Sequence, residues 1–404
     1  MFKWLKRGGT LRSNRFRVNK YDALMFIVVL LFVFSENTMN IEWLDNLFAI
    51  LERVKLKFLF SFLCCAYFYV KMPKRNLLFG DEFRLYLRNI VILVGISIGS
   101  ILIFGNRADL INESLYFFVP LFLSFFLINV RKGSVDKCIS YVFWAILIAF
   151  IIEFRDKLTL TNILSINFLN SYSPFEGELA FLSMLLVVYY SWKGERFKKI
   201  GSLVICFLSF KRITMIFSIF AFVFMKALRN KTVNSLKRYQ WIIIAIFIAV
   251  PVAMNIICSD SFATFFHSMT GIDFNLFVKG RFLAMSVAFN DYQIAGGLGS
   301  VRVFLSEYFR NYFNTNIRTY DLHCDIVRIY LECTILGLFS HVFAYVKSAK
   351  SPATLFLIFY ILLECCVNHM FGGGRSLYWI VAYLIIYSFN NPEFIENNEK
   401  ILNS

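Results

Sequence analysis

The chain has 404 residues, of which 58% are hydrophobic, 19% aromatic and only 17% charged. This composition is too apolar for one or two soluble domains and indicates a polytopic membrane protein. The formal net charge of +16 is not read as a sign of nucleic-acid binding, because no segment is long and polar enough to form a soluble domain that would bind one.

The chain begins with a basic segment, 1–20, which precedes the apolar run 21–38. No small-residue cleavage site follows in SENTMNIEW, so we expect a retained first span rather than a secretory signal. Nine further runs approach, with their flanks, the ~20 residues that a bilayer requires. They are 54–71, 89–105, 115–130, 138–154, 178–192, 240–257, 326–346, 353–370 and 376–390.

A longer apolar stretch, 198–228, carries Lys211 and Arg212 at its centre, in VICFLSFKRITMIFSIFAFVFM. A single span would bury both charges at a cost of about 5–7 kcal/mol. The segments 193–199 and 226–238 on either side are both basic, and basic loops face the cytoplasm. Two crossings must therefore lie between them, which predicts a helical hairpin whose tip presents the two cations on the outer face.

These assignments give an all-α protein with about 12 transmembrane helices, cytoplasmic termini and a single membrane domain, 1–404. Most of the 42 Lys and Arg residues then lie in cytoplasmic segments, where they orient the chain and attract anionic lipid headgroups. The one large outer loop is 258–325. Cys258 and Cys324 flank this loop, and the sequence leaves open whether they form a disulfide or are two unrelated thiols.

Cations on the outer face are the first candidates for chemistry, because the chain has no phosphate-binding glycine loop and no dinucleotide fingerprint. Arginine binds phosphate oxygens through two parallel hydrogen bonds, which suits the headgroup of an anionic lipid. The alternative for each cation is a side chain that snorkels from a helix end towards water. The candidates are Lys211, Arg212, Arg281 and Arg375.

A histidine is the second candidate. His323 lies just before the span 326–346, between Asp321 and Asp325, and could accept a proton from a hydroxyl; the alternative is a helix-entry histidine bonded to a backbone carbonyl. Asp325, Arg328 and Glu332 share one helix face and form either a self-satisfied ion-pair stripe or the wall of a polar site. No second His/Asp cluster has ligand spacing, so we predict no metal.

Three patches in order resemble the family of bacterial O-antigen polymerases (Wzy type) and O-antigen ligases. They are SFKRI at the hairpin tip, KGRFLAMSVAFNDYQIAGGLGSV in the large loop and DLHCDIVRIYLECTILGLF entering the next span. Two departures are Lys211 before the family's Arg position and Cys324 where Asn is common. The matching positions are Arg212, Gly280, Arg281, Gly296, Gly297, Gly299, His323, Glu332 and Gly337.

The resemblance implies a GT-C-type glycosyltransferase of the bacterial inner membrane, with an active site on the periplasmic face and no cofactor. Its donor would be an undecaprenyl-pyrophosphate-linked oligosaccharide. Arg212 and Arg281 would hold the pyrophosphate, and His323 would orient or deprotonate the incoming hydroxyl. Further substrate-binding candidates are Lys211, Gly280, Gly297, Arg302, Arg328, Glu332 and Arg375. Reserve acid/base candidates are Glu178, Asp291, Glu332 and Glu364.

Three activities fit this reading. A polymerase transfers the glycan to another lipid-linked repeat unit and a ligase to the core sugar of lipid A, whereas a flippase moves the lipid-linked glycan across the membrane. We favour the polymerase over the ligase on the Lys-Arg pair at the hairpin tip and the 49 Phe. A flippase predicts mid-depth cations and pseudo-symmetric halves, and the sequence shows neither. A chain-length regulator is a further candidate partner of a polymerase.

Overall fold

A computed structural model describes residues 20–35, 56–71, 77–105, 109–130, 133–167, 173–229, 231, 236–274, 278, 281–313, 320–372 and 375–392. The regular elements of this part are all α-helices. The basic segment 1–19 and Gly280, both used in the sequence analysis, lie outside the described residues. The helices before the hairpin are α1 (Lys20–Ser35), α3 (Leu56–Lys71), α4 (Gly80–Phe104), α5 (Leu110–Val130), α6 (Ser134–Phe154), α7 (Leu160–Leu164) and α8 (Leu179–Lys193). The later helices are α9 (Arg196–Leu208), α10 (Arg212–Arg229), α11 (Leu236–Ile257), α12 (Asp260–Thr270), α14 (Arg281–Asp291), α15 (Ser300–Phe313), α16 (Asp325–Ser348), α17 (Pro352–Val367) and α18 (Ser376–Asn390).

Each predicted span coincides with a helix, and the chain has the helices of a membrane protein. Among the described residues, α4, α5, α6, α11 and α16 are long and apolar enough to cross a membrane. Shorter apolar helices cover 23–33, 179–193, 352–367 and 376–390. The expectation of an α-helical membrane protein is thus confirmed, while the count of 12 crossings stays a prediction.

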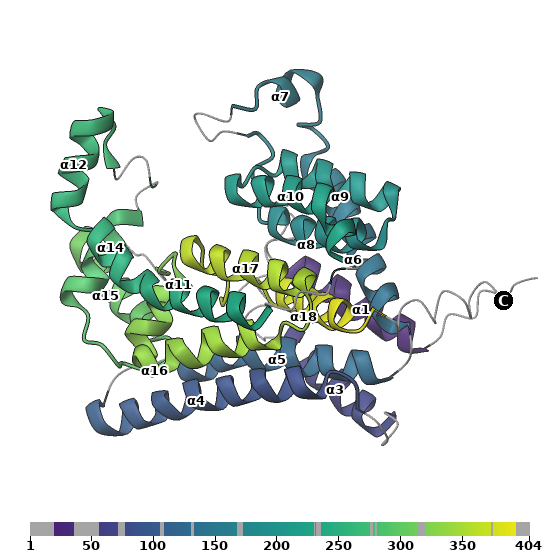
Figure 1. Cartoon of the computed structure of the whole chain (residues 1–404), viewed down its shortest axis with the longest axis horizontal. Coiled ribbons are helices and arrows are strands. Elements are labelled where there is room, and N and C mark those ends of the chain that lie inside the picture. Colours follow the sequence, from purple (N-terminus) through teal and green to yellow (C-terminus); the bar gives the residue numbers. More distant parts are fainter. Residues whose placement is uncertain are drawn as a thin grey trace, which may run out of the picture.

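The predicted hairpin is present as two helices. The stretch 198–228 is not one continuous helix, because α9 ends at Leu208 and α10 begins at Arg212. Both helices pack against α8 and against each other, as Figure 1 shows above the long helices of the bundle. The turn between them contains Lys211, at the position where the sequence placed the tip.

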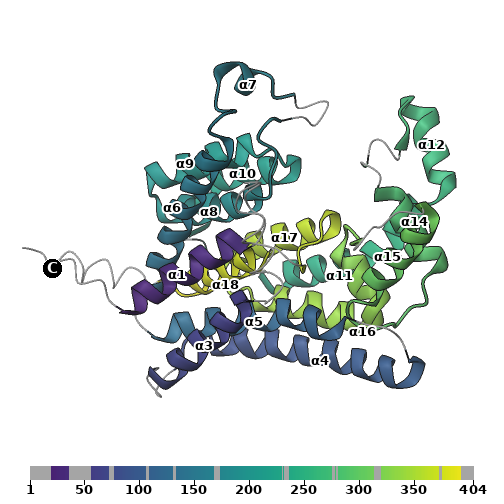
Figure 2. The same ribbon diagram turned by 180° about the vertical axis from the view of Figure 1, so that it is seen from behind.

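The large loop, 258–325, forms helices rather than irregular chain. Its described part holds α12, α14 and α15, which gather at one end of the long helices α4 and α16 in both views (Figures 1 and 2). On the opposite face of the bundle, Figure 2 shows α1 and α3 beside α5 and α18, in agreement with their contacts. The loop helices therefore cover one end of the membrane helices.

Helix α16 is broken at its centre, and a glycine-rich turn is docked into the break. Thr334 has φ 61° and ψ −176°, which interrupts the helical hydrogen bonds. The carbonyls of Leu331 and Glu332 instead accept hydrogen bonds from the backbone N–H groups of Ala295 (2.7 Å) and Gly297 (2.9 Å). Because buried carbonyls require partners, the turn before α15 completes the backbone bonding of α16.

Close packing explains the glycines of this turn. Gly297 and Gly299 have φ +86° and +85°, which favours glycine. A Cβ atom on Gly297 would lie 3.2 Å from the Cα atom of Ser97, and one on Gly299 would lie 2.9 Å from the backbone nitrogen of Asp109. The structure thus gives the predicted substrate-binding residue Gly297 a packing role between α4 and α16.

We expect Gly299→Ala to lower the stability of the protein by about 2–4 kcal/mol, because positive φ and forced backbone displacement add. The thermal midpoint of the full chain in detergent, read from a monodisperse size-exclusion peak, measures this. Gly99→Ala is the control: Gly99 lies within α4 and its Cβ would meet nothing within 4 Å, so that variant should keep or raise the wild-type midpoint, because alanine is the better helix former. Equal midpoints for all three proteins would contradict the prediction.

Candidate functional site

A polar pocket of about 260 Å³ lies at the hairpin tip, where the first turn of α10 meets α14 and the end of α17. Its charged lining brings together residues from four separate segments. These residues are Glu176, Lys211, Arg212, Arg281 and Glu364. Three of the cations singled out from the sequence thus share one cavity, although Arg212 and Arg281 are far apart in the chain.

The loop before α8 holds the hairpin tip in place. The hydroxyl of Ser173 donates a hydrogen bond to the carbonyl of Leu208 (2.7 Å), and the N–H of Gly177 donates to the carbonyl of Ser209 (3.2 Å). These bonds satisfy carbonyls at the end of α9, which have no partner within the helix. An ion pair of 3.1 Å joins Lys211 to Glu176. The tip is therefore fixed on both sides of the turn.

Arg212 is the first residue of α10, which is an unfavourable place for a cation. The positive end of the helix dipole lies there, and it stabilises anions rather than cations. A cationic side chain and a helix N-terminus that face the same cavity both favour a bound anion. The local sequence is thus better suited to anion binding than to helix stability.

Arg281 begins α14 and reaches the end of α17. Its Nη1 donates a hydrogen bond of 2.6 Å to the carbonyl of Val367. Burial and the nearby charge of Arg375 lower the pKa of the Arg281 guanidinium, which nevertheless stays a cation at neutral pH because its reference value lies so high. One face of this guanidinium remains part of the pocket lining.

Glu364 lies fully buried at the inner side of the pocket. Its two carboxylate oxygens accept hydrogen bonds from the hydroxyl of Thr214 (3.0 Å) and from the side-chain amide of Asn368 (2.7 Å). Thr214 lies in the first turn of α10 and Asn368 directly follows α17, so the carboxylate is held from two sides. Among the reserve acid/base candidates, Glu364 is a lining residue of this pocket.

Arg375 lies next to the pocket and has protein partners. Its guanidinium forms an ion pair of 2.6 Å with Glu178, donates a hydrogen bond of 2.6 Å to the carbonyl of His369 and lies over the ring of Phe181 at 4.8 Å. Two residues that the sequence suggested for substrate chemistry, Arg375 and Glu178, are therefore paired with each other.

His323 lines a second pocket, of about 160 Å³, which also contains Arg281. The side chain reaches solvent, yet the surrounding protein mass and the positive charge of Arg281 lower the pKa of its imidazole to about 4. The ring is consequently neutral at neutral pH and can accept a proton or a hydrogen bond. His323 and Arg212 thus line two different pockets, both of which include Arg281.

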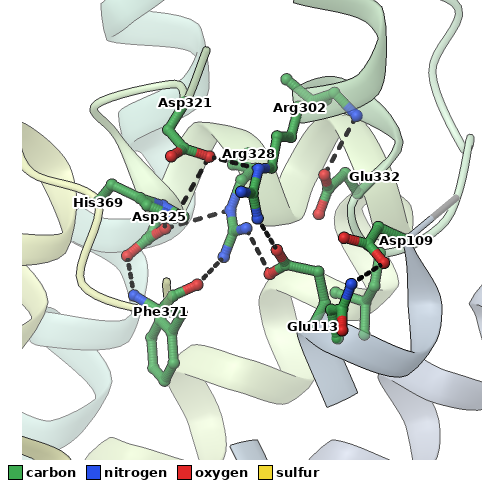
Figure 3. Close-up of polar contacts among 12 residues, drawn as sticks. Asp109, Glu113, Arg302, Asp321, Asp325, Arg328, Glu332, His369 and Phe371 are labelled. Carbon is green, nitrogen blue, oxygen red and sulfur yellow. Dashed lines mark hydrogen bonds and ion pairs between the residues drawn. The ribbon is translucent and has the colours of Figure 1, made fainter. Parts of the chain in front are cut away.

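An ion-pair network joins residues of α5, α15 and α16 (Figure 3). Arg328, with 1% of its side chain exposed, binds Glu113 of α5 at 2.7 Å and Asp325 at 3.2 Å. Asp325 also accepts hydrogen bonds from the ring of His369 (2.9 Å) and from the backbone N–H of Phe371 (2.8 Å). The predicted stripe on α16 is therefore one part of a network that joins three helices and a loop.

The remaining candidates on this side are bonded within the same region. Arg302 binds Asp321 at 3.2 Å and Glu113 at 3.6 Å, and a carboxylate oxygen of Glu332 accepts a hydrogen bond of 3.2 Å from the N–H of Val301. Neither Arg302 nor Glu332 is part of the described lining of the pocket at the hairpin tip. Their substrate-binding roles stay predictions.

The remaining predictions concern an acidic residue, a cysteine pair and a metal. Asp291 lines a separate cavity of about 340 Å³ at the far end of α14, with Tyr292, Gln293 and Glu307. Cys258 and Cys324 are both buried free thiols, so they do not form a disulfide. No group of three or more potential metal ligands occurs within the described ranges, and the prediction of metal-free chemistry is not tested by this.

The sequence analysis missed Glu113 and His369, which hold the network together. Glu113 precedes the predicted span 115–130 and lies in the first turn of α5, where a carboxylate is an ordinary helix-start residue, so no signal of its role was present in the sequence. His369 lies inside the predicted span 353–370, where an ionisable side chain is rarely without a role, but its partner Asp325 is 44 residues away in the chain and could not be inferred. Comparison of the whole chain with protein-family models, curated proteins and solved structures finds no match.

Proposed function

We propose that the protein is an O-antigen or related polysaccharide polymerase of the bacterial inner membrane. It would transfer an oligosaccharide from undecaprenyl pyrophosphate to the sugar hydroxyl of another lipid-linked repeat unit on the periplasmic face. The observation that carries the proposal is the convergence of Lys211, Arg212 and Arg281 on one pocket at an end of the helical bundle. Such a set of cations fits the pyrophosphate of a lipid-linked donor.

The proposed reaction breaks the bond between the anomeric carbon and the pyrophosphate oxygen. The acceptor oxygen forms the new glycosidic bond, its proton passes to a base, and the lipid pyrophosphate leaves with the bonding electron pair. Arg212 and Arg281 stabilise the negative charge that develops on the leaving oxygen. The neutral His323 orients the acceptor hydroxyl or takes its proton, and Glu364 is the second candidate base because it lines the same pocket as the cations.

A deletion strain separates the polymerase from the two alternatives. Loss of a polymerase should leave the lipopolysaccharide core capped with a single repeat unit, which gel electrophoresis resolves from the normal ladder. Loss of a ligase would leave bare core and polymer retained on undecaprenyl lipid, and loss of a flippase would leave no repeat unit outside. An unchanged ladder would contradict all three functions.

A further inference from the structure

Two cavities of opposite character share a wall. Val278, Arg281 and Val367 line both the polar pocket at the hairpin tip and the pocket that contains His323. The first cavity is rich in cations, as described above. The second cavity is mostly apolar, and the Arg281 side chain lies between the two.

The second cavity, which we name the apolar pocket, has a volume of about 160 Å³. Apart from Arg281 and His323, its described lining consists of apolar side chains and two thiols. These residues are Met254, Ile257, Cys258, Phe274, Val278, Phe282, Met285, Cys366 and Val367. Such a cavity gains little from water and binds apolar groups instead.

The position of the apolar pocket relates it to the membrane. Met254 and Ile257 belong to the last turn of α11, which is long and apolar enough to span a bilayer. Figure 1 shows α11, α14 and α17 meeting at the end of the bundle where the loop helices lie, and α11 contacts both other helices. A lipid chain that leaves the bilayer at this end of α11 would therefore lie next to the apolar pocket.

We infer that the apolar pocket binds the phosphate-proximal isoprene unit of the lipid carrier while Lys211, Arg212 and Arg281 bind its pyrophosphate. The inference rests on the proposed function and adds where the lipid part of the donor lies. An amphiphilic anion with an apolar chain attached directly to the phosphate is the ligand class that fits two abutting cavities of this kind. Arg281, at their common wall, would contact the phosphate that carries the chain.

The volume limits how much of the chain fits. An engineered apolar cavity of about 150 Å³ in another protein binds benzene, a six-carbon ligand. The apolar pocket, at about 160 Å³, is therefore suited to one five-carbon isoprene unit and not to two. The rest of the chain would extend into the bilayer.

Short water-soluble diphosphates test the inference by calorimetry on the full chain in nanodiscs. Methyl diphosphate carries the headgroup alone, and dimethylallyl diphosphate adds one isoprene unit. We expect the five-carbon ligand to bind about tenfold more tightly or better, because several further carbons are removed from water. Met285→Trp, which fills the apolar pocket, should abolish this preference and leave the affinity for methyl diphosphate unchanged.

A second variant covers the case in which Met285→Trp does not fold. Phe282→Ala widens the apolar pocket and should shift the preference from dimethylallyl to the ten-carbon geranyl diphosphate. Equal affinities of the wild type for methyl and dimethylallyl diphosphate, or a preference that persists in Met285→Trp, would overturn the inference and leave the proposed function intact. Failure of the wild type to bind any diphosphate would overturn the pyrophosphate site of the proposed function itself.

Discussion

Arg281→Ala should abolish the polysaccharide ladder and leave core capped with a single repeat unit. Arg281 lies at the wall between the two pockets and is the charged residue among those that line both of them. Removing one preorganised group that stabilises developing charge costs about 10²–10³-fold in rate, which is enough to suppress long chains. The lipopolysaccharide of a deletion strain that carries the variant, resolved by gel electrophoresis, gives the result.

Two further variants make the test specific. Arg281→Lys keeps the positive charge but cannot form the bidentate hydrogen bonds of a guanidinium, so it should give short polysaccharide chains rather than none. Arg310→Ala is the matched control, because Arg310 is an exposed cation on the neighbouring loop helix α15; its ladder should be normal. Immunoblots must show equal protein levels. A normal ladder from Arg281→Ala at wild-type abundance would refute the pyrophosphate role of this residue.

Arg328→Ala should prevent accumulation of the folded protein. The guanidinium is buried against the carboxylates of Glu113 and Asp325, and removing one partner of a buried ion pair leaves an uncompensated charge at a cost of about 3–5 kcal/mol. Glu113→Ala should have an effect of similar size for the same reason. The yield of monodisperse protein in detergent and its thermal midpoint measure both effects.

Replacing both Glu113 and Arg328 by uncharged residues separates a role of Arg328 in stability from a role in substrate binding. Glu113→Leu combined with Arg328→Met removes both charges, and Asp325 keeps its hydrogen bonds to His369 and Phe371. The double variant removes one charge of each sign, whereas Arg328→Ala leaves the carboxylates of both Glu113 and Asp325 without this cation, so the double variant should accumulate to a higher level than Arg328→Ala. A normal ladder from it would exclude a substrate role for Arg328, whereas a stable protein without a ladder would support that role. A stable Arg328→Ala protein would contradict the structural role.

Local patterns in the sequence were sufficient to predict where most of the helices lie. Basic flanks and the charge pair in 198–228 predicted a break, and the structure ends α9 at Leu208 and starts α10 at Arg212. The start of α4 was placed too late, because its first turns are polar; Asp81 and Glu82 in the first turn suit a helix N-terminus. Hydropathy finds the part of a helix that crosses the membrane and misses the part that extends from it.

The sequence predicted several residues of the candidate site, but not that they line two separate pockets. That Arg212 and Arg281 could meet was an expectation carried by the resemblance, and the structure does bring both into one pocket. That His323 lines a second pocket together with Arg281 depends on the packing of residues from α11, α14 and the end of α17, which no spacing in the chain encodes. Arg302 and Arg328 both pair with Glu113, which is more than 180 residues away in the chain, so the sequence could not show their surroundings.

The break in α16 has a mechanical consequence for this arrangement. The carbonyls of Leu331 and Glu332 hold the turn at residues 295–297, and this turn directly follows α14, whose first residue is Arg281. A change of bend at Thr334 would therefore be transmitted along a short rigid helix to the guanidinium at its opposite end. Arg281 is thus connected, through α14 and this turn, to the backbone of a helix that is long and apolar enough to cross a membrane.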